Sequence, residues 1–151
     1  MKTRQGDLIQ LALAGEFDVI VHGCNCHCQM GRGIALTIKQ LLPEAYVADC
    51  QTPKSDKSKL GTISTAEIKR SKTQFVVVNA YTQFDWDGEG VKADYHAIRQ
   101  VMKAIKTAFL GKRIGYPKIG AGLAGGDWAV IYPIICEELA GEDHTYVEYD
   151  V

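Results

Sequence analysis

Two glycine-rich segments, each placed between an apolar run and a helical pattern, constrain the fold of this chain more than any other feature. The first, residues 30–33, follows the apolar run 18–21 through a polar, cysteine-rich stretch, and the second, residues 119–126, follows the short apolar run 113–116. Glycine lacks a Cβ atom, so such loops let backbone N–H groups approach a bound anion closely. The order strand, glycine loop, helix places both loops beyond the carboxyl ends of strands, where ligands bind in α/β sheets.

The rest of the chain alternates strand-like and helix-like patterns. Apolar residues at helical spacing follow Gly33 as far as Leu42, and Pro43 is expected to end or interrupt that helix. Asp94 can cap another helix that runs to about Gly111. The other expected elements are strands over 61–69, 74–81, 113–116 and 144–149, a helix over 128–139, and a polar connection over 52–59. This alternation predicts an α/β fold, a three-layer α/β/α sandwich, in one domain over residues 1–151.

Composition narrows the expected partners. The 151-residue chain has a formal net charge of -1, which gives no basic field for long nucleic acids, although backbone N–H groups can still hold one small anion. Five cysteines form an odd set, and the sequence shows neither a signal-peptide pattern nor a long apolar run. We therefore expect reduced thiols in a cytoplasmic protein that does not enter a membrane, and we expect a monomer.

Two glycine loops suit a diphosphate. The second loop runs Gly120-Ala121-Gly122-Leu123-Ala124-Gly125-Gly126, and the first leads directly into a helix whose dipole favours an anion. Neither loop fits the dinucleotide-binding fingerprint or the P-loop, which needs Lys-Ser or Lys-Thr after its glycines. Taken alone, each loop is also compatible with a simple chain reversal.

Four short motifs, in order along nearly the whole chain, resemble those of the macrodomain family. They are Gly6-Asp7-Leu8-Ile9, Val21-His22-Gly23-Cys24-Asn25, Gly31-Arg32-Gly33-Ile34-Ala35, and Pro117-Lys118-Ile119-Gly120-Ala121-Gly122-Leu123. The pattern is most similar to small macrodomains: the yeast-type ADP-ribose 1″-phosphate phosphatase, phage relatives, and the terminal ADP-ribose glycohydrolase of animals. The resemblance implies a macrodomain fold with a central mixed sheet and a cleft that binds ADP-ribose.

The resemblance also implies roles for matching positions. Asp7 would accept the adenine amino group with Leu8 beside it, Tyr149 would pack by the adenine, and Asn25 would hold the distal ribose. The remaining expected substrate-binding residues are Val21, Met30, Gly31, Gly33, Ile34, Gly120, Ala121, Gly122, Leu123, Ala124 and Gly125. No cofactor and no metal is implied.

Two residues are candidates for catalysis. His22 stands where many macrodomains have asparagine, and the phosphatase subgroup resembles this chain in having histidine there. It could move a proton or attack a phosphoryl group, or it could be a hydrogen-bonded core histidine. Asp127 could orient His22, activate water, or simply cap the helix that begins at Trp128.

The sequence departs from the animal glycohydrolases, which have a lysine after the middle strand and an aspartate after the Gly-Leu of the second loop. Here Tyr81-Thr82-Gln83 lies near the first place and Ala124 occupies the second. We therefore expect hydrolysis of ADP-ribose 1″-phosphate to ADP-ribose and phosphate. The alternatives are removal of ADP-ribose from ADP-ribosylated proteins, and a reader that binds ADP-ribose without transforming it.

Two further segments each allow two interpretations. The cluster His22, Cys24, Cys26, His27 and Cys28 contains zinc-ligand residue types, but Cys50 and Cys136 are isolated and no second distant pair completes a site, so buried or loop thiols are favoured. The segment Phe84, Asp85, Trp86, Asp87 and Glu89 could cover the distal ribose or form an exposed loop.

Overall fold

The structure, a computed structural model, describes residues 2–85 and 90–149. Trp86, Asp87 and Glu89, named above as part of a possible cover, lie outside the described residues. The six strands form one mixed sheet in the order β1-β6-β5-β2-β4-β3, in which only β3 runs antiparallel to its neighbour among the described strands. The strands are β1 (Lys2–Gln5), β2 (Val19–Cys24), β3 (Ile63–Arg70), β4 (Thr73–Tyr81), β5 (Ile114–Tyr116) and β6 (His144–Glu148).

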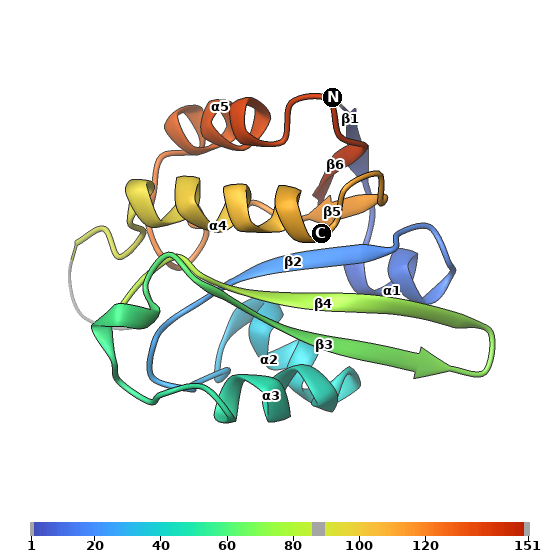
Figure 1. Ribbon diagram of the computed structural model, residues 1–151, viewed down its shortest axis with the longest axis horizontal. Coiled ribbons are helices and arrows are strands. Elements are labelled where there is room, and N and C mark those ends of the chain that lie inside the picture. Colours follow the sequence, from blue (N-terminus) through green and yellow to red (C-terminus); the bar gives the residue numbers. More distant parts are fainter. Residues whose placement is uncertain (1, 86–89, 150–151) are drawn as a thin grey trace.

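Helices cover both faces of this sheet, as Figure 1 shows. On one face lie α4 and α5, and on the other lie α1, α2 and α3. The helices are α1 (Leu8–Leu13), α2 (Gly33–Leu41), α3 (Pro43–Cys50), α4 (Tyr95–Ala108) and α5 (Trp128–Glu138), with a short 3₁₀ turn η1 (Lys57–Lys59). The predicted three-layer α/β/α fold with a mixed sheet is confirmed.

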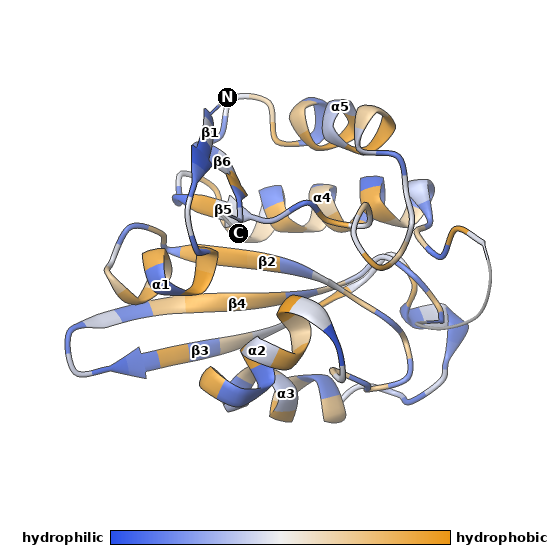
Figure 2. Cartoon of the chain, turned by 180° about the vertical axis from the view of Figure 1, so that it is seen from behind, coloured by the Kyte–Doolittle hydropathy of each residue, from blue (hydrophilic) through white to orange (hydrophobic). Residues whose placement is uncertain are grey.

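The central strands supply apolar side chains to two separate cores. Figure 2 shows β2 and β4 as largely apolar, which is typical of strands buried on both faces. Val19 and Val21 of β2 pack with α4 and α5, whereas Ile20 packs with α1, α2 and α3. Successive residues of a strand point to opposite faces, so β2 alternates between the two cores. In the described chain, no helix has the length and apolarity to cross a membrane.

Four of the described elements were not predicted from the sequence patterns: β1, α1, α3 and the short turn η1. The strand β1 is exposed along its whole length and pairs with β6 at the edge of the sheet. Pro43 does end α2, but it also occupies the first turn of α3, where its missing N–H costs nothing. The strand β2 also continues to Cys24, three residues beyond its predicted end.

Aspartate side chains cap three of the helices. Asp7, Asp94 and Asp127 each accept hydrogen bonds from N–H groups in the first turn of α1, α4 and α5 respectively. The helix α2 begins differently: its N-cap residue is Arg32, and no described side chain caps its first turn. The first N–H groups of α2 are therefore left for another acceptor.

Candidate functional site

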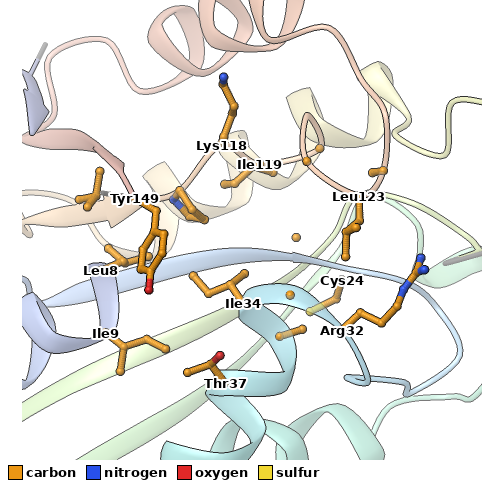
Figure 3. Close-up of a pocket in the computed structure, with 18 of the residues that line it drawn as sticks. Leu8, Ile9, Cys24, Arg32, Ile34, Thr37, Lys118, Ile119, Leu123 and Tyr149 are labelled. Atoms are coloured by element: carbon orange, nitrogen blue, oxygen red, sulfur yellow. The ribbon is translucent and has the colours of Figure 1, made fainter. Parts of the chain in front are cut away.

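A cleft of about 760 Å³ lies at the carboxyl ends of the parallel strands, between the two glycine loops. Its walls come from the β1–α1 turn, the end of β2, the first turns of α2, residues 117–124, and the end of β6. Figure 3 shows Leu8 and Tyr149 on one side of this cleft and Arg32 and Leu123 on the other. The volume is in the usual range for a small-molecule site.

One end of the cleft carries a carboxylate, an apolar wall and an aromatic ring. Asp7 Oδ1 accepts hydrogen bonds from the N–H groups of Ile9 (3.0 Å) and Gln10 (3.1 Å). Its other oxygen accepts none from the described residues and is available to a ligand donor. Leu8 is buried, and Tyr149 is 66% exposed with its ring on the cleft wall. This end can recognise a flat heterocycle that carries an amino group.

The first glycine loop delivers the uncapped start of α2 to the cleft. Gly33, Ile34 and Ala35, the first residues of this helix, all line it. Gly33 has φ +59, in the left-handed region that favours glycine, and this bend turns the loop into the helix. Because helix N-termini carry unsatisfied N–H groups and a partial positive charge, this loop is suited to holding an anion.

The second glycine loop faces the first across the cleft. Gly122, Leu123 and Ala124 line it, and their backbone N–H groups donate to no other backbone carbonyl in the described chain. The loop is closed beneath by a hydrogen bond from Gly126 N to Gly120 O of 2.7 Å. Two sets of backbone donors thus converge on one space.

Asn25 lies at the far end of the cleft, where β2 ends. Its side-chain oxygen accepts from His27 N (2.9 Å), and its amide nitrogen donates to Gln29 O (2.8 Å). Asn25 is mostly buried but lines the cleft. The side chain therefore shapes the loop after β2, and each of its polar atoms retains one further hydrogen-bonding position for a ligand.

His22 is placed in the core and does not line the cleft. It points from β2 toward α3, with no exposed surface, and Nε2 lies 2.7 Å from Asn79 Oδ1. Asn79 in turn donates to Ala45 O (2.9 Å). Burial lowers the pKa of His22 to about 4, and the hydrogen bond to Asn79 offsets only part of that shift. A neutral, enclosed imidazole cannot reach a ligand, so this placement does not support the predicted catalytic role.

Asp127 also lies away from the cleft lining. Its Oδ1 accepts from Ala129 N at 2.9 Å, so the side chain caps α5. The structure therefore favours the capping role over the catalytic one. Four of the predicted substrate-binding residues are likewise absent from the lining: Val21, Met30, Ala121 and Gly125. Val21 and Met30 are core residues, because strand alternation and loop packing turn their side chains inward.

The other predicted binding residues all line the cleft: Asp7, Leu8, Asn25, Gly31, Gly33, Ile34, Gly120, Gly122, Leu123, Ala124 and Tyr149. Several lining residues were not predicted although they belong to the same four motifs, among them Gly23, Arg32 and Lys118. Others come from segments without a recognisable motif, namely Gln29, Thr37, Gln83, Tyr146, Val147 and Glu148. These residues reach the cleft only through the way the strands and helices are arranged in the fold, so no sequence motif could identify them.

The histidines and cysteines at the end of β2 and in the loop after it show no metal-binding geometry among the described residues. No three His, Cys, Asp or Glu side chains within 2–85 and 90–149 are placed to hold a metal ion. Cys24 lines the cleft, but burial raises the pKa of its thiol well above the usual value, so it is a poor nucleophile at neutral pH. Cys26 and Cys28 are buried thiols.

Comparison with known proteins gives relatives that cover most or all of the chain. An uncharacterized 17.5 kDa protein of the tk-vs intergenic region of Enterobacteria phage T4 is 33% identical over 140 residues, which cover 89% of this chain and 87% of that protein. A structural-genomics crystal structure from Bacteroides thetaiotaomicron is 28% identical with a TM-score of 0.77, and the match covers 100% and 99% of the two chains.

A more distant likeness concerns the fold alone. Thermosipho africanus DarTG, solved in complex with ADP-ribose, is 18% identical with a TM-score of 0.72, and the match covers 100% of this chain and 42% of that chain. The family model described as Macro domain matches residues 21–135, which is more than half of the chain. This match and the phage relative together show that the chain belongs to the Macro domain family.

Proposed function

We propose that the protein binds ADP-ribose in the cleft between its two glycine loops. The observation that carries the proposal is the uncapped N-terminus of α2, which lines the cleft opposite the backbone donors of the second loop. Such donors suit a diphosphate. A protein of the same fold, Thermosipho africanus DarTG, was solved with ADP-ribose.

We propose a direction for the ligand from the different residues at the two ends of the cleft. The adenine would lie between Leu8 and Tyr149, with its amino group donating to the unoccupied oxygen of Asp7. The diphosphate would lie between the loops, and the distal ribose would lie at Asn25. This arrangement uses side chains for the base and backbone N–H groups for the charged centre.

The substitution Asp7→Asn tests the adenine contact without removing the helix cap. Asparagine caps helices as well as aspartate does, but its NH₂ group would face the adenine amino group. We expect ADP-ribose affinity, measured by calorimetry, to fall roughly 10- to 100-fold, the usual value of a hydrogen bond to a charged group. Asp94→Asn is the matched control, because Asp94 caps α4 away from the cleft. Equal affinities for the two variants would contradict the assigned direction.

A finer proposal is that the protein hydrolyses ADP-ribose 1″-phosphate to ADP-ribose and phosphate. Arg32 supports it, because this residue lines the cleft at the end opposite Tyr149, where the terminal phosphate would lie, and a guanidinium can bind phosphate. His22 is too buried to contact that phosphate, so groups on the cleft wall would have to orient the attacking water. Cleavage of ADP-ribose from protein side chains and binding without hydrolysis are the alternatives.

Phosphate release from ADP-ribose 1″-phosphate separates these activities. We expect Arg32→Gln to lower kcat/KM about 10-fold, while Lys118→Gln, a change at the opposite wall, serves as the cation control. Tight ADP-ribose binding by a wild type that releases no phosphate would contradict hydrolysis and leave the binding proposal intact. Release of ADP-ribose from a modified protein would then favour the second alternative.

A further inference from the structure

A second polar cluster lies behind the far end of the cleft and outside its lining. His27 Nδ1 lies 2.7 Å from Ser55 Oγ, and His27 Nε2 lies 2.8 Å from Asp85 Oδ1. The three residues come from separate segments: the loop after β2, the connection between α3 and η1, and the loop after β4. A hydroxyl, an imidazole and a carboxylate in this order form the arrangement that activates a nucleophile.

The hydrogen bonds determine which ring nitrogen carries the proton. The Asp85 carboxylate can only accept, so Nε2 of His27 donates to it. In the neutral ring, Nδ1 then carries the lone pair and accepts from the Ser55 hydroxyl. His27 is thus oriented to take the serine proton, and Asp85 is placed to stabilise the imidazolium that results.

Contacts outside the three side chains hold them in this geometry. Cys26 N donates to Phe84 O (3.0 Å), and Ser55 N donates to Cys26 O (2.7 Å), so backbone hydrogen bonds join all three segments. The His27 ring packs edge-on against Phe84, with ring centroids 4.6 Å apart. A group held by its surroundings loses little further entropy when it reacts.

Ser55 itself is exposed and has an unusual backbone. Its φ is +60, in the left-handed region that non-glycine residues rarely adopt, and such conformations are found at sharp turns that present a functional side chain. Lys57 Nζ lies 5.2 Å from the centroid of Phe84, so a positive charge lies close to the cluster of Ser55, His27 and Asp85. In contrast, the hydroxyl of Ser58, which lies in η1 three residues further on, donates to Asp56 Oδ1.

We propose that Ser55 is a nucleophile for acyl transfer, with His27 as its general base and Asp85 as the positioning residue. The Ser55 Oγ–acyl carbon bond forms, the ester carbon–oxygen bond breaks, and the serine proton passes through His27 to the departing alkoxide. Water then attacks the acyl-serine, and its proton returns through His27 to Ser55 Oγ. The net reaction converts an ester and water into an acid and an alcohol. The expected substrates are small esters with an anionic group, because the site is open and Lys57 adjoins it.

A fluorophosphonate probe tests this nucleophile directly, because its phosphorus is attacked by activated serine with loss of fluoride. We expect wild-type protein to take up the probe at Ser55, located by peptide mass spectrometry. Ser55→Ala should lose the label, and His27→Gln should react about 100-fold more slowly. Ser58→Ala, a matched serine without a histidine partner, should react like the wild type. Thermal unfolding of each variant checks that the fold is retained.

Asp85 is tested by a pair of substitutions and by turnover. Asp85→Asn should slow labelling, and Asp85→Glu should restore part of the rate, which a purely structural loss would not do. p-Nitrophenyl acetate should be hydrolysed by the wild type and not by Ser55→Ala. Label or turnover retained in Ser55→Ala, or equal rates in the wild type and His27→Gln, would overturn the proposal. None of the three residues lines the cleft, so calorimetry with ADP-ribose on the same variants tests the two sites separately.

Discussion

The two glycine loops face the same cleft but are held in place by different means. The second loop is packed into the core. A Cβ atom on Gly120 would lie 3.1 Å from Ile98 Cδ1, and one on Gly126 would lie 2.5 Å from Gly120 O. The first loop is open, since a Cβ atom on Gly31 would meet nothing within 4 Å. In the second loop, glycine is therefore needed because neighbouring atoms leave no space for a side chain. In the first loop, it is needed for the backbone conformation and for close approach of a ligand.

The support beneath each loop differs in the same way. Apolar side chains of α4 and α5 enclose the second loop. The strand that leads to the first loop is fixed partly by a buried polar pair, His22 and Asn79, which links β2 to β4 and α3. One half of the cleft thus depends on close packing, and the other depends on a buried hydrogen bond made by an imidazole that burial keeps neutral.

Gly126→Ala is expected to have the largest effect. The added methyl group would overlap a backbone oxygen that cannot rotate away, so we expect a loss of about 4 kcal/mol in the free energy of unfolding. Chemical denaturation measures this loss. Gly122→Ala is the control on the same loop, because its Cβ would meet nothing within 4 Å. Similar stability of the two variants would remove the distinction between packed and open glycines.

The polar support under the first loop should make stability depend on pH. The pKa of His22 is about 4 in the folded protein and near 6.5 when unfolded, so the unfolded state binds more protons between these values. The contribution is therefore complete above pH 6.5 and is lost as the pH falls toward 4. We expect a loss of roughly 2 kcal/mol between pH 7 and pH 5.

The substitution His22→Gln identifies the source of this dependence. Glutamine does not titrate, so the part of the pH slope due to His22 should disappear even if the variant is less stable overall. His144, whose pKa is also lowered by burial, retains its own contribution and makes His144→Gln the matched comparison. An unchanged slope in His22→Gln would show that the strand does not depend on this imidazole.

Substitutions in the first, open loop should lower the free energy of unfolding least, and they should also weaken ligand binding. Gly33→Ala places a side chain at φ +59 and should cost about 1 kcal/mol in unfolding free energy. Gly31→Ala should cost less than about 0.5 kcal/mol, since no atom opposes the methyl group. Both should weaken ADP-ribose binding in calorimetry if the ligand contacts this backbone. Normal binding by Gly31→Ala would place the diphosphate elsewhere in the cleft.

The sequence predicted the layered fold because its elements carry strong periodic patterns. The helix α4 has buried residues at helical spacing and an aspartate cap, and β4 carries the unbroken apolar run 75–78. The strand β1 could not be predicted in this way, since Lys2–Gln5 is exposed and polar and is a strand only through its pairing with β6. Likewise α1 is only six residues long, too short for a periodic pattern to identify.

The candidate site was predicted well where glycine and motif order determine the backbone, and poorly where a side-chain direction was needed. Gly33 and Gly122 both line the cleft as expected. For His22 the sequence left a catalytic role and a hydrogen-bonded core position open. Because β2 continues past His22, alternation turns its side chain toward α3 and away from the cleft. Moving one position along a strand changes whether a side chain points into the core or into the cleft. No local pattern in this sequence shows where β2 ends, so the direction of the His22 side chain could not be predicted.

The pairing of β1 with β6 has a consequence for the order of folding. Lys2 donates to Asp143, 141 residues away along the chain, and Gly6 N donates to Glu148 O beside Tyr149. Closing a loop of that length costs roughly 4 kcal/mol of chain entropy, so this corner should assemble after the local hairpin of β3 and β4. A ligand bound between Leu8 and Tyr149 would therefore stabilise the contacts that form last. Its binding free energy would add to the stability of the pairing between β1 and β6.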